Sequence, residues 1–230
     1  MRKAFLMGMA GLVLSVQTAR AANTETTEQQ WLSKLHHVEQ TCGTNKQSYG
    51  EMLFAVGNFY HRQGNLVRSE EMFARAMKIF QSEPGNHGDL LRYYSDQLAR
   101  VYAEEGKSQE AETLFKRAIA LADQMPGKDK TFVVPQTLAG LSSLYVNQKR
   151  YDDAENATKQ RIQLRHRFMN AGQVDVAYVD LANIYIKAGK LDQAKDVIDL
   201  LLTMQNPPAE VKTAIGSYAD AKSSGKVTSQ

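Results

Sequence analysis

One pattern occurs four times along the 230-residue chain, each time around a tyrosine: Tyr60, Tyr102, Tyr145 and Tyr185. An apolar and a small residue precede each tyrosine, and a turn, a small residue and an apolar face follow it. The apolar residues recur at three- and four-residue steps, which is the spacing of an amphipathic helix. Each copy therefore predicts a helical hairpin. Because one hairpin cannot bury both of its faces, the four copies predict an all-α stack of tandem hairpins.

The expected turn inside each hairpin carries glycine in the first, second and fourth copies. Gly64, Gly106 and Gly189 stand where a helix ends in left-handed backbone geometry, which glycine adopts without steric cost. Lys149 replaces glycine in the third copy, so the sequence leaves the form of that turn open.

Small residues occupy the predicted crossing of the two helices in each hairpin. With no bulky side chain there, the two backbones can approach closely while larger neighbours fill the grooves. On the first helices these residues are Gly57, Ala99, Ser142 and Ala182, and on the second helices they are Ser69, Ala111, Ala154 and Ala194.

The chain begins with the features of an export signal. Arg2 and Lys3 precede an apolar run over residues 4–16, and a small-x-small site follows at residues 19–21. We expect cleavage between Ala21 and Ala22 and a periplasmic or secreted mature protein. The run is shorter than the ~20 apolar residues that a membrane-spanning helix needs, so no membrane span is expected after cleavage.

Breakers such as Pro84-Gly85 and Pro207-Pro208 divide the remainder into units. Apolar residues at helical spacing flank the repeats on both sides and predict helices that cover the end hairpins. The predicted parts are a cleaved signal peptide (1–21), an N-terminal capping helix (22–47), four hairpins (50–83, 92–125, 135–168 and 175–208), a C-terminal capping helix (209–221) and a disordered tail (222–230).

Charge and cysteine content exclude several classes of function. The full chain has a formal net charge of +3, and removing Arg2, Lys3 and Arg20 with the signal leaves a formal charge of zero. A basic footprint for nucleic acid or an anionic membrane is therefore not expected. Cys42 is the only cysteine, so no intramolecular disulfide can form and the fold must be held by packing.

The repeated pattern resembles the tetratricopeptide repeat (TPR), over about residues 50 to 208. The second copy fits the TPR pattern best, with Leu98, Ala99, Tyr102, Gly106, Ala111, Phe115 and Ala118. Its long repeats are similar to those of the kinesin-light-chain variety. This resemblance implies a right-handed α-solenoid. Thr158 and Arg161 depart from the usual aromatic and small residues of the third copy, and Ile198 and Leu201 depart in the fourth, so those hairpins are either splayed or packed by a neighbouring segment.

The resemblance also implies that the first helices line a groove for a peptide or another protein. Amide side chains there could donate to and accept from an extended peptide backbone. The alternative is that these polar residues are simply solvated helix faces. TPR modules that capture carboxylate tails need cations where Phe54, Gln136 and Gly140 stand, so that mode is not expected. The predicted groove residues are Asn58, Arg62, Asp96, Arg100, Ser143, Asn147, Asp180, Asn183 and Lys187.

No constellation of catalytic or metal-ligating residues has meaningful spacing in the sequence. Adjacent His36 and His37 point about 100° apart on a helix, and no second Cys or His pair completes a tetrahedral set with Cys42. We therefore expect no cofactor, no metal and no enzymatic activity.

The sequence thus predicts an exported, non-catalytic scaffold or adaptor, with an envelope assembly factor as a narrower form. Its partner would be a protein or peptide, and the chain itself a monomer or a weak homo-oligomer. Two alternatives stay open: a structural module that self-associates end to end, and an enzyme whose site lies in the groove.

Overall fold

The computed structural model describes residues 28–44, 46–82, 87–124, 130–168, 176–204 and 207–225. All regular secondary structure in these residues is helical. The predicted signal peptide (1–21), the start of the N-terminal capping region (22–27), the breakers around residues 83–86 and the end of the tail (226–230) lie outside the described residues. The chain divides into two compact units, one up to Gly85 and one from Asn86, which we describe separately.

The first unit contains helical residues 28–42 and the first hairpin, formed by α2 (Gln47–Arg62) and α3 (Leu66–Ser82). Residues 28–42 pack on this hairpin, since the rings of Trp31 and Phe59 have centroids 6.3 Å apart and the Tyr60 hydroxyl donates to Glu28 at 2.8 Å. Within the hairpin, Phe54 stacks on Phe73 at 4.8 Å.

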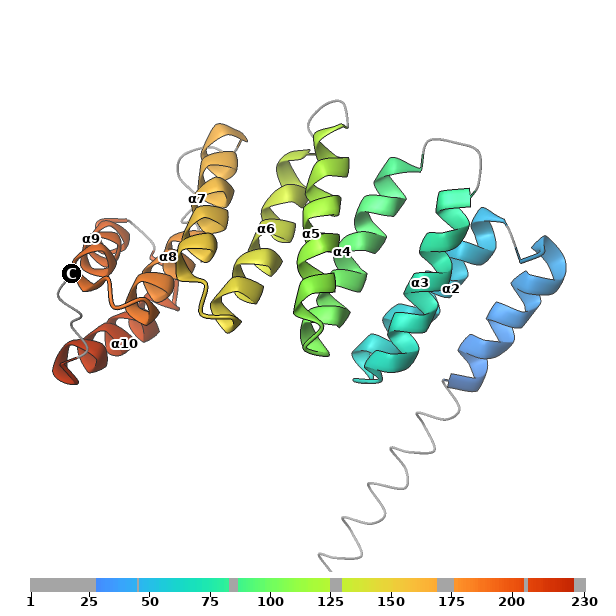
Figure 1. Cartoon of the computed structure of the whole chain (residues 1–230), viewed down its shortest axis with the longest axis horizontal. Coiled ribbons are helices and arrows are strands. Elements are labelled where there is room, and N and C mark those ends of the chain that lie inside the picture. The colour runs from blue at the N-terminus through green and yellow to red at the C-terminus, as the bar shows by residue number, and fades with distance from the viewer. Residues whose placement is uncertain are drawn as a thin grey trace, which may run out of the picture. The chain divides into compact units, whose positions relative to one another are not determined.

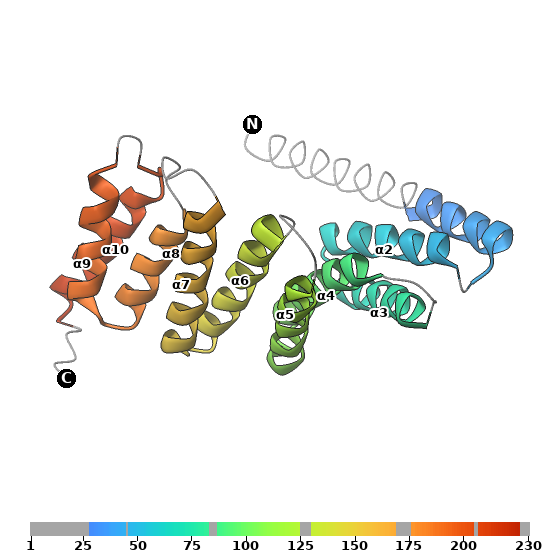
Figure 2. The same cartoon turned by 90° about the horizontal axis from the view of Figure 1, so that it is seen from above.

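The second unit contains three hairpins and a final helix, which Figure 1 shows in chain order. The helices are α4 (Gly88–Glu104), α5 (Ser108–Asp123), α6 (Lys130–Asn147), α7 (Tyr151–Phe168), α8 (Val176–Lys187), α9 (Leu191–Leu202) and α10 (Val211–Ser223). Each hairpin packs on the next through α5 against α6 and α7 against α8. The last helix, α10, lies against both α8 and α9 (Figure 2). It extends into the predicted tail, which was expected to begin at residue 222.

The four hairpin turns share one backbone geometry, which the tyrosine pattern predicted for three of them. The residue five positions after each tyrosine donates its N–H to the tyrosine carbonyl, at 2.8–2.9 Å, from Asn65, Lys107, Arg150 and Lys190. Gly64, Gly106 and Gly189 have φ between 74° and 79° in these turns. Lys149 has φ 60° at the corresponding place. The third turn, left open by the sequence, is therefore the same left-handed turn despite the absence of glycine.

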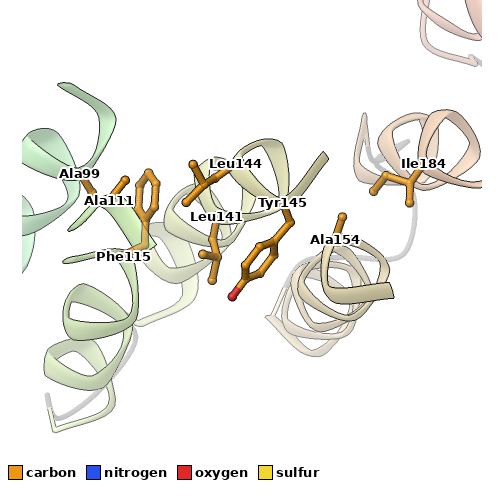
Figure 3. Packing of buried hydrophobic residues seen from close by; sticks show 8 residues of the cluster. All are labelled: Ala99, Ala111, Phe115, Leu141, Leu144, Tyr145, Ala154 and Ile184. Carbon is orange, nitrogen blue, oxygen red and sulfur yellow. The ribbon is translucent and has the colours of Figure 1, made fainter. Parts of the chain in front are cut away.

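The core of the second unit runs continuously from one hairpin into the next (Figure 3). Ala99 and Ala111, both fully buried, let α4 and α5 approach each other, and Phe115 packs beside them. Leu141, Leu144 and Tyr145 of α6 then connect this layer with Ala154 of α7 and Ile184 of α8. The small residues predicted at the helix crossings therefore lie in the buried core.

The third hairpin departs from the TPR pattern without splaying open. Thr158, where an aromatic residue is usual, is fully buried. The Ser142 hydroxyl donates to the Ala154 carbonyl at 3.2 Å and lies 2.8 Å from the Thr158 hydroxyl. A buried hydrogen-bonded pair of hydroxyls thus takes the place of the aromatic side chain between α6 and α7.

Candidate functional site

A groove in the second unit runs along α4, α6 and α8, the first helices of its hairpins. It consists of cavities that share lining residues: Ala139 borders all of those described below, and Arg100, Ser143 and Asn147 each border two. The side chains lining the groove come from different hairpins, so the stacking of the hairpins forms it. We name its parts the arginine cavity, the central cavity and the amide cavity.

The amide cavity lies between α6 and α8 and has a volume of about 230 Å³. Asn147 is exposed and Asn183 is half-buried. With Ser143 they offer amide and hydroxyl groups, while Asp180 and Lys187 contribute opposite charges. Groups of this kind can both donate to and accept from a peptide backbone.

The central cavity, of about 500 Å³, lies between α4 and α6, and Gly140 forms part of its wall. A Cβ atom at position 140 would come within 2.8 Å of two carbon atoms of the Phe115 ring, so the close packing of α6 on α5 requires glycine here. Gly140 stands where carboxylate-binding TPR modules have a cation. The structure supplies the reason, because the Phe115 ring occupies the space next to it.

The arginine cavity has a volume of about 430 Å³ and lies between α4, α6 and α7. Four arginines border it, whereas Asp96 is the single carboxylate among its lining residues. Tyr93, which is 43% exposed, adds an aromatic face. The four arginines are Arg92 and Arg100 of α4 and Arg161 and Arg165 of α7.

Two ion pairs orient arginines of this cavity. Arg100 Nε donates to Asp96 Oδ2 at 3.0 Å, and its Nη2 donates to the Gln136 carbonyl at 3.2 Å. Asp96 is only 5% exposed, so it serves to hold Arg100. Arg161 Nη1 donates to Asp180 Oδ2 at 2.6 Å, which links the arginine cavity to the amide cavity.

The structure brings together the predicted groove residues of the second, third and fourth repeats. Asp96 and Arg100 border the arginine cavity, and Arg100 also borders the central cavity. Ser143 and Asn147 border the central and amide cavities, and Asp180, Asn183 and Lys187 border the amide cavity. Their role in binding stays a prediction.

The two predicted residues of the first repeat lie on α2 in the other unit. Asn58 is half-buried and Arg62 is exposed. Arg62 Nε donates to the Asn58 carbonyl at 3.3 Å, one helical turn earlier. They are therefore not part of the groove described here.

Arg92 of α4 borders the arginine cavity although it was not among the predicted groove residues. Arg161 and Arg165 were not predicted either. Both are on a second helix, whereas the resemblance placed the groove on first helices alone. The sequence did carry one indication, because Arg161 stands where the TPR pattern has a small residue. The matching residue of the second repeat is Ala118, which is buried. An arginine at an inward-facing position must send its charged end to water or to a partner.

The part of the chain that the structure describes holds no group of three or more His, Cys, Asp or Glu side chains that could bind a metal ion. Among these same residues, no helix combines the length and the hydropathy needed to cross a membrane.

A family model described as the MalT-like TPR region matches residues 17–207. Among curated proteins, Cellulose synthase operon protein C of Xanthomonas axonopodis pv. citri (strain 306) is 24% identical and covers 64% of this chain. The mitochondrial Tetratricopeptide repeat protein 19 homolog of Drosophila melanogaster is 25% identical and covers 67%. The chain spans only 11% and 44% of the lengths of these relatives.

Two solved structures have a similar fold. BtubC (BKLC) from P. vanneervenii matches with a TM-score of 0.66 at 15% identity, covering 88% of this chain and 83% of that one. A putative kinesin light chain with nearly identical TPR-like repeats from Podosopora anserina matches with a TM-score of 0.66 at 14% identity, covering 87% and 91%. These matches confirm the predicted all-α class of tandem hairpins and the kinesin-light-chain-like form of the repeats.

Proposed function

Because the chain belongs to the MalT-like TPR region family, we propose that it is a non-catalytic scaffold that binds an extended segment of a partner protein. The binding site is the groove along α4, α6 and α8. The TPR fold points to protein partners in general, and the groove gives the proposal a location in this chain.

The observation that carries this proposal is the continuity of the groove across three hairpins. Arg100, Ser143 and Asn147 each border two of its cavities, so neighbouring cavities from α4 to α8 share polar side chains. An extended peptide needs a donor or an acceptor at regular intervals along its backbone. The side chains of Ser143, Asn147 and Asn183 provide such groups on neighbouring helices.

The test is a selection of short random peptides displayed against the full-length protein, followed by affinity measurements with variants. We expect Asn147→Ala and Asn183→Ala each to weaken the selected peptides about fivefold, the loss of about one hydrogen bond. Asn156→Ala is the matched control, since Asn156 is exposed on α7 and borders none of the groove cavities described above. If no selected peptide depends on Asn147 or Asn183, the groove is not the binding site.

Export to the periplasm or the exterior is the second part of the proposal, and assistance to an envelope assembly is its narrower form. Arg2, Lys3 and the small residues Ala19 and Ala21 support export. Mass spectrometry of the mature protein after expression in a bacterium with two membranes tests it. A mature N-terminus at Ala22 in the periplasmic fraction is expected, and an intact N-terminus in the cytoplasm would contradict it.

Self-association is a second candidate, favoured by apolar side chains near the C-terminal end of the second unit. Leu200 and Leu202 of α9 and Ile215 of α10 are exposed. Large apolar residues left in water at the end of a repeat array can pair with another copy. Molecular mass measured against concentration distinguishes the two candidates, because a monomeric adaptor keeps one mass throughout.

A further inference from the structure

The arginine cavity differs in charge from the rest of the groove. Arg92, Arg100, Arg161 and Arg165 border it, against Asp96 as the single carboxylate in its lining. The amide cavity, in contrast, has one carboxylate and one ammonium group, Asp180 and Lys187. A local excess of positive charge is notable in a chain whose total formal charge is only +3.

We propose that the arginine cavity binds the carboxylate groups of an acidic segment of the partner protein. This inference rests on the proposed function of the groove and adds the chemistry of the segment. The guanidinium group presents several N–H donors in a planar fork that matches a carboxylate, so arginines converging on one cavity favour such a ligand.

The arrangement of the arginines supports a built site rather than a solvated surface. Arg92, Asp96 and Arg100 follow each other at four-residue steps and share one face of α4, and Arg161 and Arg165 do so on α7. These two faces border the same cavity. The buried Asp96 fixes Arg100, whose guanidinium also reaches the Gln136 carbonyl on α6. Such preorganisation lowers the conformational entropy that the Arg100 side chain would lose when a ligand binds.

Asp180 occupies the place that a ligand carboxylate would take on Arg161. The Arg161 side chain is only 13% exposed, whereas that of Asp180 is 46% exposed. An exposed carboxylate is readily solvated when it is released, while Arg161 must keep an anionic partner. A carboxylate of the bound segment can therefore replace Asp180, which competes with it in the free protein.

The adjoining surfaces favour a peptide over a small free anion. Tyr93 supplies an exposed aromatic face beside the arginines, on which an apolar side chain of the segment can pack. Ala139 borders the arginine, central and amide cavities, so the three lie next to one another. A segment anchored by its carboxylates can thus continue past Asn147 and Asn183.

The competition gives opposite predictions for the two members of the ion pair. Arg161→Gln removes the donor and should weaken the selected peptides about tenfold, as expected for one charge-assisted hydrogen-bonding pair. Asp180→Asn removes the competitor and should strengthen the same peptides about threefold, by an amount that shrinks with added salt. Arg167→Gln is the matched control, because Arg167 lies on α7 but does not border the cavity.

The experiment uses peptides selected from the random display against the full-length protein, each synthesised with a free and with an amidated C-terminus. We expect Asp and Glu to be enriched among them, and replacement by Asn and Gln to abolish the effect of Arg161→Gln. Equal binding of the two C-terminal forms is expected, because the inferred contacts are to side-chain carboxylates. Loss of binding on amidation would assign the contact to a terminal carboxylate and overturn the inference. Thermal unfolding of each variant verifies that it is folded.

Several outcomes would overturn the inference while leaving the proposed function intact. One is a set of peptides that depend on Asn147 but show neither acidic enrichment nor sensitivity to Arg161→Gln. Another is a weakening by Asp180→Asn as large as that by Arg161→Gln, which would make the pair structural. A third is displacement of the bound peptide by inorganic phosphate at the same concentration at which an unlabelled copy of the peptide displaces it. That result would assign the cavity to a free anion instead. Absence of any peptide dependent on Asn147 or Asn183 would overturn both proposals.

Discussion

The Tyr145 hydroxyl donates a 3.0 Å hydrogen bond to Glu112 Oε1, which joins α6 to the second helix of the preceding hairpin. Arg150, at the turn after Tyr145, donates to the other oxygen of Glu112 at 2.6 Å and lies over the Tyr145 ring at 4.3 Å. The repeated tyrosine therefore does more than fill the core, since its hydroxyl and the cation five residues later hold one carboxylate between them.

The same arrangement recurs one hairpin later. The Tyr185 hydroxyl donates to Glu155 Oε1 at 3.1 Å, and Lys190 donates to Glu155 Oε2 at 2.8 Å. Glu112 and Glu155 each follow the small residue at the helix crossing, Ala111 and Ala154. The repeat thus specifies a contact between neighbouring hairpins as well as the hairpin itself.

We predict that the second unit loses stability at acidic pH because this contact is lost there. Hydrogen bonds from Arg150, and then from Lys116 and Tyr145, lower the pKa of Glu112 from 4.5 to about 2. A carboxyl group whose pKa is lower in the folded than in the unfolded state stabilises the fold at pH values above its unfolded pKa. This stabilisation is lost as the pH falls from 4.5 through 2. Urea denaturation in a pH series should show a shallower loss for Glu112→Gln than for the unaltered protein.

Glu155 should behave in the same way. Its burial alone would raise the pKa, but hydrogen bonds from Lys159, Lys190 and Tyr185 outweigh burial and lower the pKa to about 2.

The control for the Glu112 variant is Glu110→Gln, since Glu110 is exposed on the same helix as Glu112. Equal pH dependence for Glu110→Gln and Glu112→Gln would refute the assignment to the tyrosine-linked carboxylates.

The left-handed turn at Lys149 predicts a stabilising substitution. Lys149 has φ 60°, which costs a non-glycine residue about 1 kcal/mol or more. Lys149→Gly removes that strain but gives the unfolded chain more freedom, so a net gain of about 0.5 kcal/mol in the free energy of unfolding is expected. Gly106→Ala, at the corresponding turn of the second hairpin, should instead lose about 1 kcal/mol. A loss in both variants, measured by chemical denaturation, would count against the turn geometry.

Two helical glycines should respond in opposite directions to the same change. Gly140→Ala places a Cβ 2.8 Å from the Phe115 ring, which is buried and cannot move without disturbing the core, so a loss of about 1–3 kcal/mol is expected. Gly216 on α10 has open space around its Cβ position, and Gly216→Ala should gain about 0.5–1 kcal/mol from helix propensity. Melting temperatures that change in the same direction for both variants would contradict this packing.

The buried hydroxyl pair of the third hairpin predicts a non-additive result. Because Ser142 donates to the Ala154 carbonyl, the Thr158 hydroxyl is the donor in its contact with Ser142. Ser142→Ala leaves that donor buried without its acceptor and should cost about 1–3 kcal/mol. Adding Thr158→Val removes the stranded hydroxyl, so the double variant should recover most of the loss. Strictly additive free energies of unfolding would show that the two hydroxyls do not depend on each other.

Sequence periodicity determined the helices, because the residues that decide them are close along the chain. The three- and four-residue steps around Tyr102 predicted α4 and α5, and the glycine at position 106 predicted the turn between them. The same local reasoning left the turn at Lys149 open, since its left-handed geometry comes from the hydrogen bond between Arg150 and the Tyr145 carbonyl and not from residue preference.

Tertiary structure decided which polar residues face one another. The resemblance to the TPR family implied that Arg100 and Asp180 are groove residues, and both lie in the groove. It did not select Arg161, because it placed the groove on first helices alone, whereas Arg161 of α7 borders the same cavity as side chains of α4 and α6. It selected Asp96 as a groove residue as well, but predicted neither the burial of Asp96 nor its ion pair with Arg100. Repeat periodicity is a property of neighbouring residues, whereas the charge of a cavity is set by side chains that only the stacking of separate hairpins brings together.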